Sequence, residues 1–260
     1  MVRIFRGRAR QPLGPGGLND VLNTSGGLTR DIFVAVGAAT QRGGSLTMIE
    51  AIRQLSVFLG TVQPERGSRL DDETVVRQMA SRRALETTRM AQQTAAAMSS
   101  DAAVRLKSKL LQMDVSLATY GDAIDVVGDF HDAEWWRVER AVKTEASRVY
   151  NAARTDAIID LAHDHPGMLK RWTELVDDAT GMPMDKRVGV DSIVLHGQVA
   201  APLAMFTFPP DSRVPKMVGM SWVQPPNRPQ DRAVLLPWLP SFGMPAWKYV
   251  AGQRITMPQE

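Results

Sequence analysis

The chain has 260 residues, of which 44% are hydrophobic and 23% charged, a composition typical of a folded protein with a substantial core. It contains no cysteine, which excludes disulfides, thiolate metal sites and cysteine nucleophiles. Its 31 basic and 28 acidic residues leave a net charge of only +3, so the overall charge does not indicate a nucleic-acid partner. We expect no secretory signal, because the basic N-terminus lacks an apolar h-region, and no membrane partner, because no apolar run approaches the length of a membrane span.

Residues 1–27 are predicted to form an extended basic arm or loop. Residues 7–27 are rich in Gly, Pro and Asn, which favours irregular backbone. Four arginines precede the first acidic residue of the chain: Arg3, Arg6, Arg8 and Arg10. Such a concentration is typical either of a solvated tail or of an arm that contacts DNA or an acidic partner surface.

Residues 28–165 are predicted to form a helical domain, because one proline interrupts them and their apolar residues recur at helical spacing. We expect short helices near 32–39 and 47–58. The two acids at 71–72 predict the start of a third helix. The Ser-Ser-Asp sequence at 99–101 is expected to break that helix and to cap the next one.

The longest predicted helix runs from about Ala133 to Ala162, where apolar side chains at every third or fourth position form one stripe. Pro166 and Gly167 predict its end. Trp135 and Trp136, near its start, have the chemistry to stack on a base. A buried anchor role for at least one of them is the more frequent arrangement, and we expect it here.

Residues 166–260 are predicted to form a small, irregular α+β domain rich in Pro and Trp, since eleven of the 16 prolines follow residue 201. Short strands are expected at Ser192–Leu195, Met205–Phe208 and Ala233–Leu236. The whole chain is therefore predicted to have an α+β fold. Its N-terminal part is mainly helical, and its C-terminal part is irregular with short strands.

No motif in the chain indicates catalysis or a bound cofactor. His163 and His165 lie at a predicted helix end, where histidine commonly caps the last carbonyl groups, and no further ligands follow at metal-site spacing. The sequence has no Gly-x-Ser-x-Gly nucleophile turn and no phosphate-binding Gly-Lys-Ser/Thr loop. We therefore predict a protein that is not an enzyme and has no cofactor or metal.

A series of short motifs runs through residues 140–236 in a defined order. They are Lys143-Thr144-Glu145, Asn151-Ala152-Ala153-Arg154, Arg171-Trp172 with Asp177-Asp178, Asp185-Lys186-Arg187-Val188, Leu195-His196-Gly197-Gln198-Val199, Phe206 with Pro209-Pro210, and Pro225-Pro226-Asn227-Arg228. In this order and spacing the motifs resemble those of the phage Mu F-like head morphogenesis family of minor capsid proteins. No single motif is specific to this family. The resemblance depends on all of the motifs occurring in this order and at this spacing.

The resemblance implies structural roles for twelve residues: Thr144, Glu145, Asn151, Trp172, Asp178, Asp185, Arg187, His196, Gly197, Phe206, Asn227 and Arg228. We expect Asn151 to hydrogen-bond the backbone of the C-terminal loops, and Gly197 to adopt a positive φ at a turn. Ion pairs of Asp178 and Asp185 with Arg187 and Arg228 are expected to hold irregular backbone.

The chain departs from the family pattern at its closing motif. The family ends in Asn-Cys-Arg-Cys, whereas this chain has Pro229 and Asp231 nearby in place of the cysteines. Asp191 stands where many members have a histidine. Because the family residues suggest a zinc-supported turn, we expect this chain to hold the same turn without metal.

The resemblance implies a non-enzymatic virion component, located in the phage head and, during assembly, in the host cytoplasm. Such a protein would bind the phage portal protein and/or the major capsid protein and be present in multiple copies per virion. The alternative is an internal head protein associated with packaged DNA through Arg3 to Arg10 and the basic helix around Arg82. An enzyme is less favoured, since the chain lacks a recognisable catalytic set.

Overall fold

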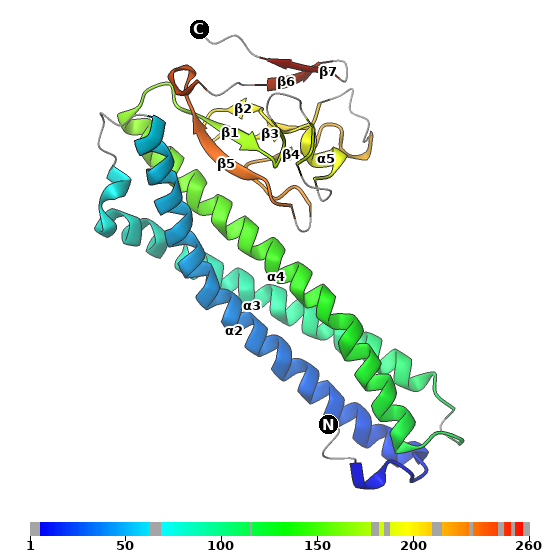
Figure 1. Cartoon of the computed structure of the whole chain (residues 1–260). Coiled ribbons are helices and arrows are strands. Elements are labelled where there is room, and N and C mark those ends of the chain that lie inside the picture. Colours follow the sequence, from blue (N-terminus) through cyan, green and yellow to red (C-terminus); the bar gives the residue numbers. More distant parts are fainter. Residues whose placement is uncertain are drawn as a thin grey trace. The chain divides into compact units, whose positions relative to one another are not determined.

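The computed structural model describes residues 6–62, 69–114, 116–177, 182–184, 188–209, 215–228, 231–243, 247–250 and 253–256. The predicted α+β class is confirmed, since long helices come first and short antiparallel strands follow (Figure 1). The chain forms two compact units. Unit 1 contains residues 1–42 and 88–142, and unit 2 contains residues 43–87 and 143–260. None of the described helices is both long and apolar enough to span a membrane.

Helix α2 (Gly14–Val62) takes the place of the predicted loop at 14–27 and of the two short helices predicted after it. Leu18 and Val21 are buried, and their burial outweighs the low helix propensity of the surrounding glycines. Pro15 occupies the first turn, where its missing N–H leaves no hydrogen bond unmade.

The N-terminal basic segment is not an extended arm from residue 8 onward, contrary to the prediction. Leu13 N donates to Ala118 O at 2.8 Å, and Gly121 N donates to Ala9 O at 2.9 Å, so the segment is bonded along residues 118–121. A short 3-10 helix, η1 (Arg6–Arg8), precedes it, and the Arg8 guanidinium lies 5.9 Å from the centre of the Tyr120 ring. Arg3 and the Arg6 side chain lie outside the described residues, while Arg10 is exposed.

Helix α3 (Glu73–Leu111) follows the 3-10 turn η2 (Arg69–Asp71) and runs through residues 99–101 without the predicted break. Its start is as predicted, since Asp72 Oδ1 accepts a hydrogen bond from Thr74 N at 2.8 Å. The break is absent because the buried face continues through Ala95, Ala102, Leu106 and Leu110, and two serines cost a helix little against that burial.

Helix α4 (Tyr120–Asp164) begins at Tyr120 rather than near Ala133. Thr119 and Asp122 cap this start reciprocally. Asp122 Oδ2 accepts from Thr119 N at 2.8 Å, and Thr119 Oγ1 accepts from Asp122 N at 3.3 Å. The C-terminal end at Asp164 agrees with the stop predicted from Pro166.

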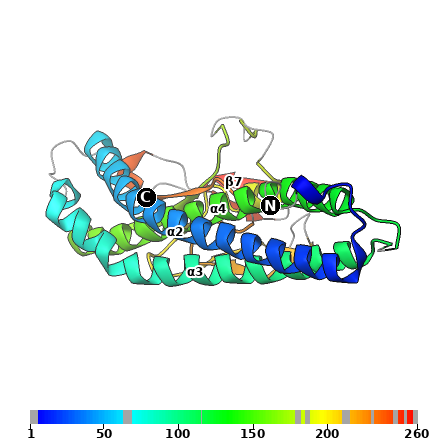
Figure 2. The same cartoon turned by 90° about the horizontal axis from the view of Figure 1, so that it is seen from below.

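Unit 1 has its own apolar core, in which segments of the three long helices pack side by side (Figures 1 and 2). The buried members of this core are Leu13, Leu18, Val21, Ala102, Leu106, Leu110, Tyr120, Ala123, Val127, Phe130 and Val138. The three helix segments therefore hold one another without help from a sheet.

Unit 2 is built on a small antiparallel sheet in which β1 (Leu169–Thr173) lies between β2 (Val199–Ala200) and β5 (Val234–Trp238). In its register Trp172 pairs with Leu235. β5 is an edge strand, which is why it tolerates Pro237. β5 confirms the strand predicted near 233–236, whereas β1 was not predicted.

The remaining elements of unit 2 are short. β3 (Phe206–Thr207) pairs with β4 (Ser221–Trp222), confirming the strand predicted near Phe206. The strand predicted at Ser192–Leu195 is wrong, because this stretch forms helix α5 (Val190–Ile193) and a turn. The 3-10 turns η3 (Pro215–Met217) and η4 (Pro240–Phe242) and the hairpin of β6 (Trp247–Val250) and β7 (Gln253–Thr256) complete the described chain.

Candidate functional site

The described part of unit 2 buries many polar and charged side chains beside its apolar core. Burial of such groups is unfavourable unless each finds a partner, so their contacts show what they do. We call the following residues the buried polar network: Asn151, Arg154, Thr155, Lys170, Glu174, Ser192, His196, Asn227 and Asp231. All but Asn227 are buried, and Asn227 is half-buried.

Asn151 joins helix α4 to the start of strand β5. Its Nδ2 donates to Ala233 O at 3.0 Å, and its Oδ1 accepts from Leu235 N at 2.9 Å. A second hydrogen bond of Nδ2, to Ser147 O at 3.0 Å, fixes the side chain on the helix. The predicted hydrogen bonding of Asn151 to C-terminal backbone is therefore present. The side-chain amide gives the strand one donor and one acceptor, as the backbone of a neighbouring strand would.

Arg154, one turn further along α4, bonds the same strand. Its Nη1 donates to Leu235 O at 2.8 Å, and its guanidinium lies 4.7 Å from the centre of the Tyr150 ring. Burial lowers the pKa of Arg154 from its ordinary value. Thr155 Oγ1 lies 2.8 Å from Gln224 Oε1, which brings the segment before β5 onto the same helix.

Lys170 is a buried lysine on β1 whose ammonium nitrogen donates to Val223 O at 2.7 Å. The nitrogen also lies 5.3 Å from the centre of the Phe206 ring. Burial lowers the pKa of Lys170 to about 8, because the charged form loses its hydration. The residue thus holds the β4 end of the domain against β1 at an electrostatic cost.

Glu174 and Asp231 are two buried carboxyl groups that interact electrostatically. Burial, and after it the negative charge of Asp231, raise the pKa of Glu174 to about 8. Glu174 therefore retains its proton at neutral pH. Asp231 is the better placed anion, since Asn227 N and Ala233 N each donate to its carboxylate at 3.1 Å.

Ser192, on α5, connects the helix to the loop that precedes β5. Its hydroxyl oxygen lies 3.1 Å from Asn227 Oδ1 and 3.1 Å from Asp231 Oδ1, and it donates its proton to one of them at a time. Asp231 stands near the place where the resembled family has a cysteine. In this chain a carboxylate with backbone and hydroxyl donors organises the turn.

His196 is buried, and its Nδ1 accepts a hydrogen bond from Glu174 N at 3.0 Å. An accepting Nδ1 carries a lone pair, so the ring is neutral and its proton lies on Nε2. His196 therefore provides an acceptor for the backbone just after β1.

Gly197 follows in a tight turn with φ of 78°, as predicted. Gly197 N donates to Trp172 O at 2.7 Å, and Trp172 N donates to Gln198 O at 3.0 Å. The buried Trp172 ring contacts Phe206 edge to face at 5.3 Å between ring centres. These contacts attach the turn to both the sheet and the core.

The other residues that the resemblance singles out are distributed differently. Glu145 pairs along the helix with Arg148, whose Nε lies 3.0 Å from Glu145 Oε2, and Thr144 is half-buried on the same helix. Arg228 is half-buried beside Asn227. Asp178, Asp185 and Arg187, and the Asp191 side chain, lie outside the described residues, and so do the ion pairs predicted for them.

Sequence reasoning missed most of the buried polar network. Arg154, Lys170, Glu174 and Ser192 carry no signal of burial in a single sequence, because polar residues are usually exposed. Asp231 had a partial signal, since it stands near a position that the resembled family fills with cysteine. Eight of the nine side chains hydrogen-bond backbone or each other, and Glu174 Oε1 is buried without a hydrogen-bond partner among the described residues. The network can therefore hold irregular backbone in place.

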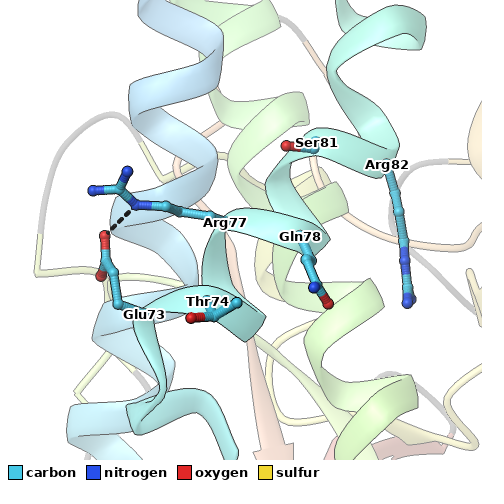
Figure 3. Close-up of a pocket in the computed structure, with 6 residues that line it drawn as sticks. All are labelled: Glu73, Thr74, Arg77, Gln78, Ser81 and Arg82. Atoms are coloured by element: carbon cyan, nitrogen blue, oxygen red, sulfur yellow. Dashed lines mark hydrogen bonds and ion pairs between the residues drawn. The ribbon is translucent and has the colours of Figure 1, made fainter.

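The exposure of two tryptophans contradicts a further expectation. Trp135 and Trp136 are 62% and 50% exposed, so the predicted burial of at least one of them is wrong. The basic face around Arg82 includes a shallow hollow lined by Glu73, Thr74, Arg77, Gln78, Ser81 and Arg82 (Figure 3). There Arg77 Nε pairs with Glu73 at 2.9 Å, and Arg77 and Arg53 lower the pKa of Glu73. Part of this positive charge is therefore neutralised locally.

Within the described ranges, no group of three or more His, Cys, Asp or Glu side chains is arranged to hold a metal ion. No protein-family model, curated protein or solved structure matches this chain.

Proposed function

We propose that this chain is a bacteriophage minor head protein, a structural virion component that acts in capsid assembly by binding portal and/or capsid proteins. One observation carries the proposal: residues of the ordered motifs meet in one place. Asn151, Trp172, the adjacent pair His196-Gly197, and Asn227 come from four separate stretches of the chain, yet each is bonded within the domain that surrounds β1.

The hydrogen bonds of the buried polar network support a role in assembly rather than in catalysis. Buried side chains of the network satisfy backbone groups of short strands and turns, which would otherwise lack partners. Such an arrangement gives a small, loop-rich domain a fixed surface. A fixed surface favours binding to other proteins, because little conformational entropy is lost when it docks.

The experiment is to isolate procapsids and mature particles of the phage that encodes this chain and to examine them by quantitative mass spectrometry. The proposal expects the chain in both, in multiple copies per particle. Its absence from particles of both kinds would contradict the proposal. Copurification of the purified chain with the portal protein of the same phage, compared with the major capsid protein, identifies the partner.

The alternative function, an internal head protein associated with DNA, must be distinguished from a portal- or capsid-binding protein. Binding of the purified chain to duplex DNA is measured from about 50 mM salt upward, where phosphate contacts give steeply salt-dependent affinity. Loss of such binding in the Arg8→Ala, Arg10→Ala double variant would favour the DNA-associated protein. Particle incorporation without DNA binding favours the portal- or capsid-bound protein.

A further inference from the structure

Unit 1 exposes two adjacent tryptophans on α4, although large aromatic side chains are usually buried or used in binding. Trp135 is 62% exposed and Trp136 50%. The Arg137 guanidinium lies 5.6 Å from the centre of the Trp136 ring and 3.4 Å from Glu134, so one face of Trp136 is already covered. Trp135 is therefore the indole better placed to enter a partner.

The surroundings of these indoles are acidic. Asp129, Asp132 and Glu139 are exposed and lie three to seven residues from the tryptophans, on the same side of the helix. Two exposed cations, Arg140 and Lys143, lie four and seven residues after Trp136, while the charge of Arg137 is balanced by Glu134. Three acids against two cations leave these surroundings net acidic. We call Trp135, Trp136, Asp132 and Glu139 the tryptophan face.

A second surface of unit 1 has the opposite character. The α2–α3 groove has a volume of about 580 Å³ and is lined mainly by small side chains, among them Gly26, Ala38, Ala96 and Ala103. At its base Gly37 faces Ala95, and a Cβ on Gly37 would lie only 3.0 Å from Ala95 Cβ. The two helices thus approach closely, and the small residues that predominate among the described lining leave room above them.

The rim of the α2–α3 groove is basic. Arg30 lines it and is exposed. Arg89 and Lys107 are also exposed, and they lie three residues before Gln92 and four residues after Ala103, two residues that line the groove. Asp101 lies between them but forms an ion pair with Arg105. Asp31 is exposed three residues before Val34, which also lines the groove, so it offsets one of the three cations and leaves the rim net basic. The net basic groove therefore complements the net acidic tryptophan face in charge.

We propose that the tryptophan face of one copy of this chain docks into the α2–α3 groove of a second copy. Each large aromatic side chain can bury roughly 150–250 Å². Two indoles would thus form the centre of a standard interface of about 800 Å² per partner, with the charged rims completing it. Because the two surfaces differ, a pair joined by one contact keeps one groove and one tryptophan face open. Such contacts build filaments or closed rings, and a ring of two copies has two reciprocal contacts.

Sedimentation velocity on the full chain from about 1 to 100 µM tests the proposal, over a range that detects micromolar affinity. We expect concentration-dependent association that weakens as salt rises. Two changes should each abolish it: the Trp135→Ser, Trp136→Ser double variant, and Ala96→Phe, which fills the groove. Leu117→Ser is the matched control, since Leu117 is 81% exposed in the same unit but belongs to neither surface.

Mixing the two variants makes the test decisive. The tryptophan-free variant keeps its groove and the Ala96→Phe variant keeps its tryptophan face, so an equimolar mixture should form a 1:1 complex that neither forms alone. Ala38→Phe provides a second filled groove if Ala96→Phe does not fold by circular dichroism. A monomeric wild-type chain at 100 µM, or association that survives in the filled-groove variants, would overturn the proposal. The second result would show tryptophan faces packing on each other.

Discussion

Asn151 and Leu235 are 84 residues apart in sequence, and the side-chain carbonyl of Asn151 accepts the backbone N–H of Leu235 at 2.9 Å. This contact places the edge strand β5 against α4 through one amide. The contact involves no ion pair and no metal. A single substitution can therefore test how much it contributes to the stability of unit 2.

Asn151→Ala should destabilise unit 2 by about 3 kcal/mol, because it leaves Leu235 N and Ala233 O buried without this partner. Urea unfolding followed by tryptophan fluorescence measures the change. Asn23→Ala is the control, since Asn23 is exposed on α2 and its replacement should cost almost nothing. Equal unfolding midpoints for Asn151→Ala and the wild type would contradict this role.

Glu174 should make the stability fall as pH rises. Its pKa is about 8 in the folded chain because of burial and the nearby Asp231 charge, against an ordinary value of 4.5. The folded state therefore binds more protons between these values. The contribution of Glu174 is fully present below pH 4.5 and is lost as pH rises through about 8.

The urea midpoint of the wild type, measured from pH 5 to pH 8, should thus decline, and Glu174→Gln should flatten the decline because its amide stays neutral. Glu139→Gln, at an exposed position, serves as the control and should keep the wild-type slope. A Glu174→Gln variant with an unchanged slope would show that this carboxyl does not retain its proton.

Lys170 should act in the opposite direction at higher pH. Its pKa is lowered by burial from 10.5 to about 8, so the unfolded chain binds more protons between these values. Stability from this group therefore rises with pH across that window. Lys170→Met should remove the rise in unfolding midpoint, while Lys107→Met, on the exposed face of α3, should leave it. A rise that persists in Lys170→Met would assign it to other groups.

Gly197→Ala should destabilise unit 2 by about 1–2 kcal/mol, because the native φ of 78° disfavours a side chain. Gly60→Ala in α2 should instead stabilise by about 0.5–1 kcal/mol, since the helix has open space at that position. The thermal unfolding temperatures of the two variants, compared with that of the wild type, measure the expected loss and the expected gain of stability. A neutral Gly197→Ala would mean that the turn adjusts without strain.

Much of the helical part was predictable, and its boundaries were not. The apolar spacing predicted helices over residues 28–165, and Pro166 predicted the end of α4. The starts of α2 and α4 lie earlier than predicted because Leu18, Val21 and Tyr120 are buried in a tertiary core. Local glycine and serine residues argue against helix there, and only packing between segments outweighs them.

The candidate site divides in the same way. The sequence by itself determined which residue types were available: an amide at Asn151, a flexible glycine at Gly197 and no thiol for a metal. Only the tertiary structure decided that Lys170 and Glu174 are buried and that Asp231 meets Ser192. Burial of a charge becomes tolerable through partners distant in sequence, and local pattern carries no information about those partners.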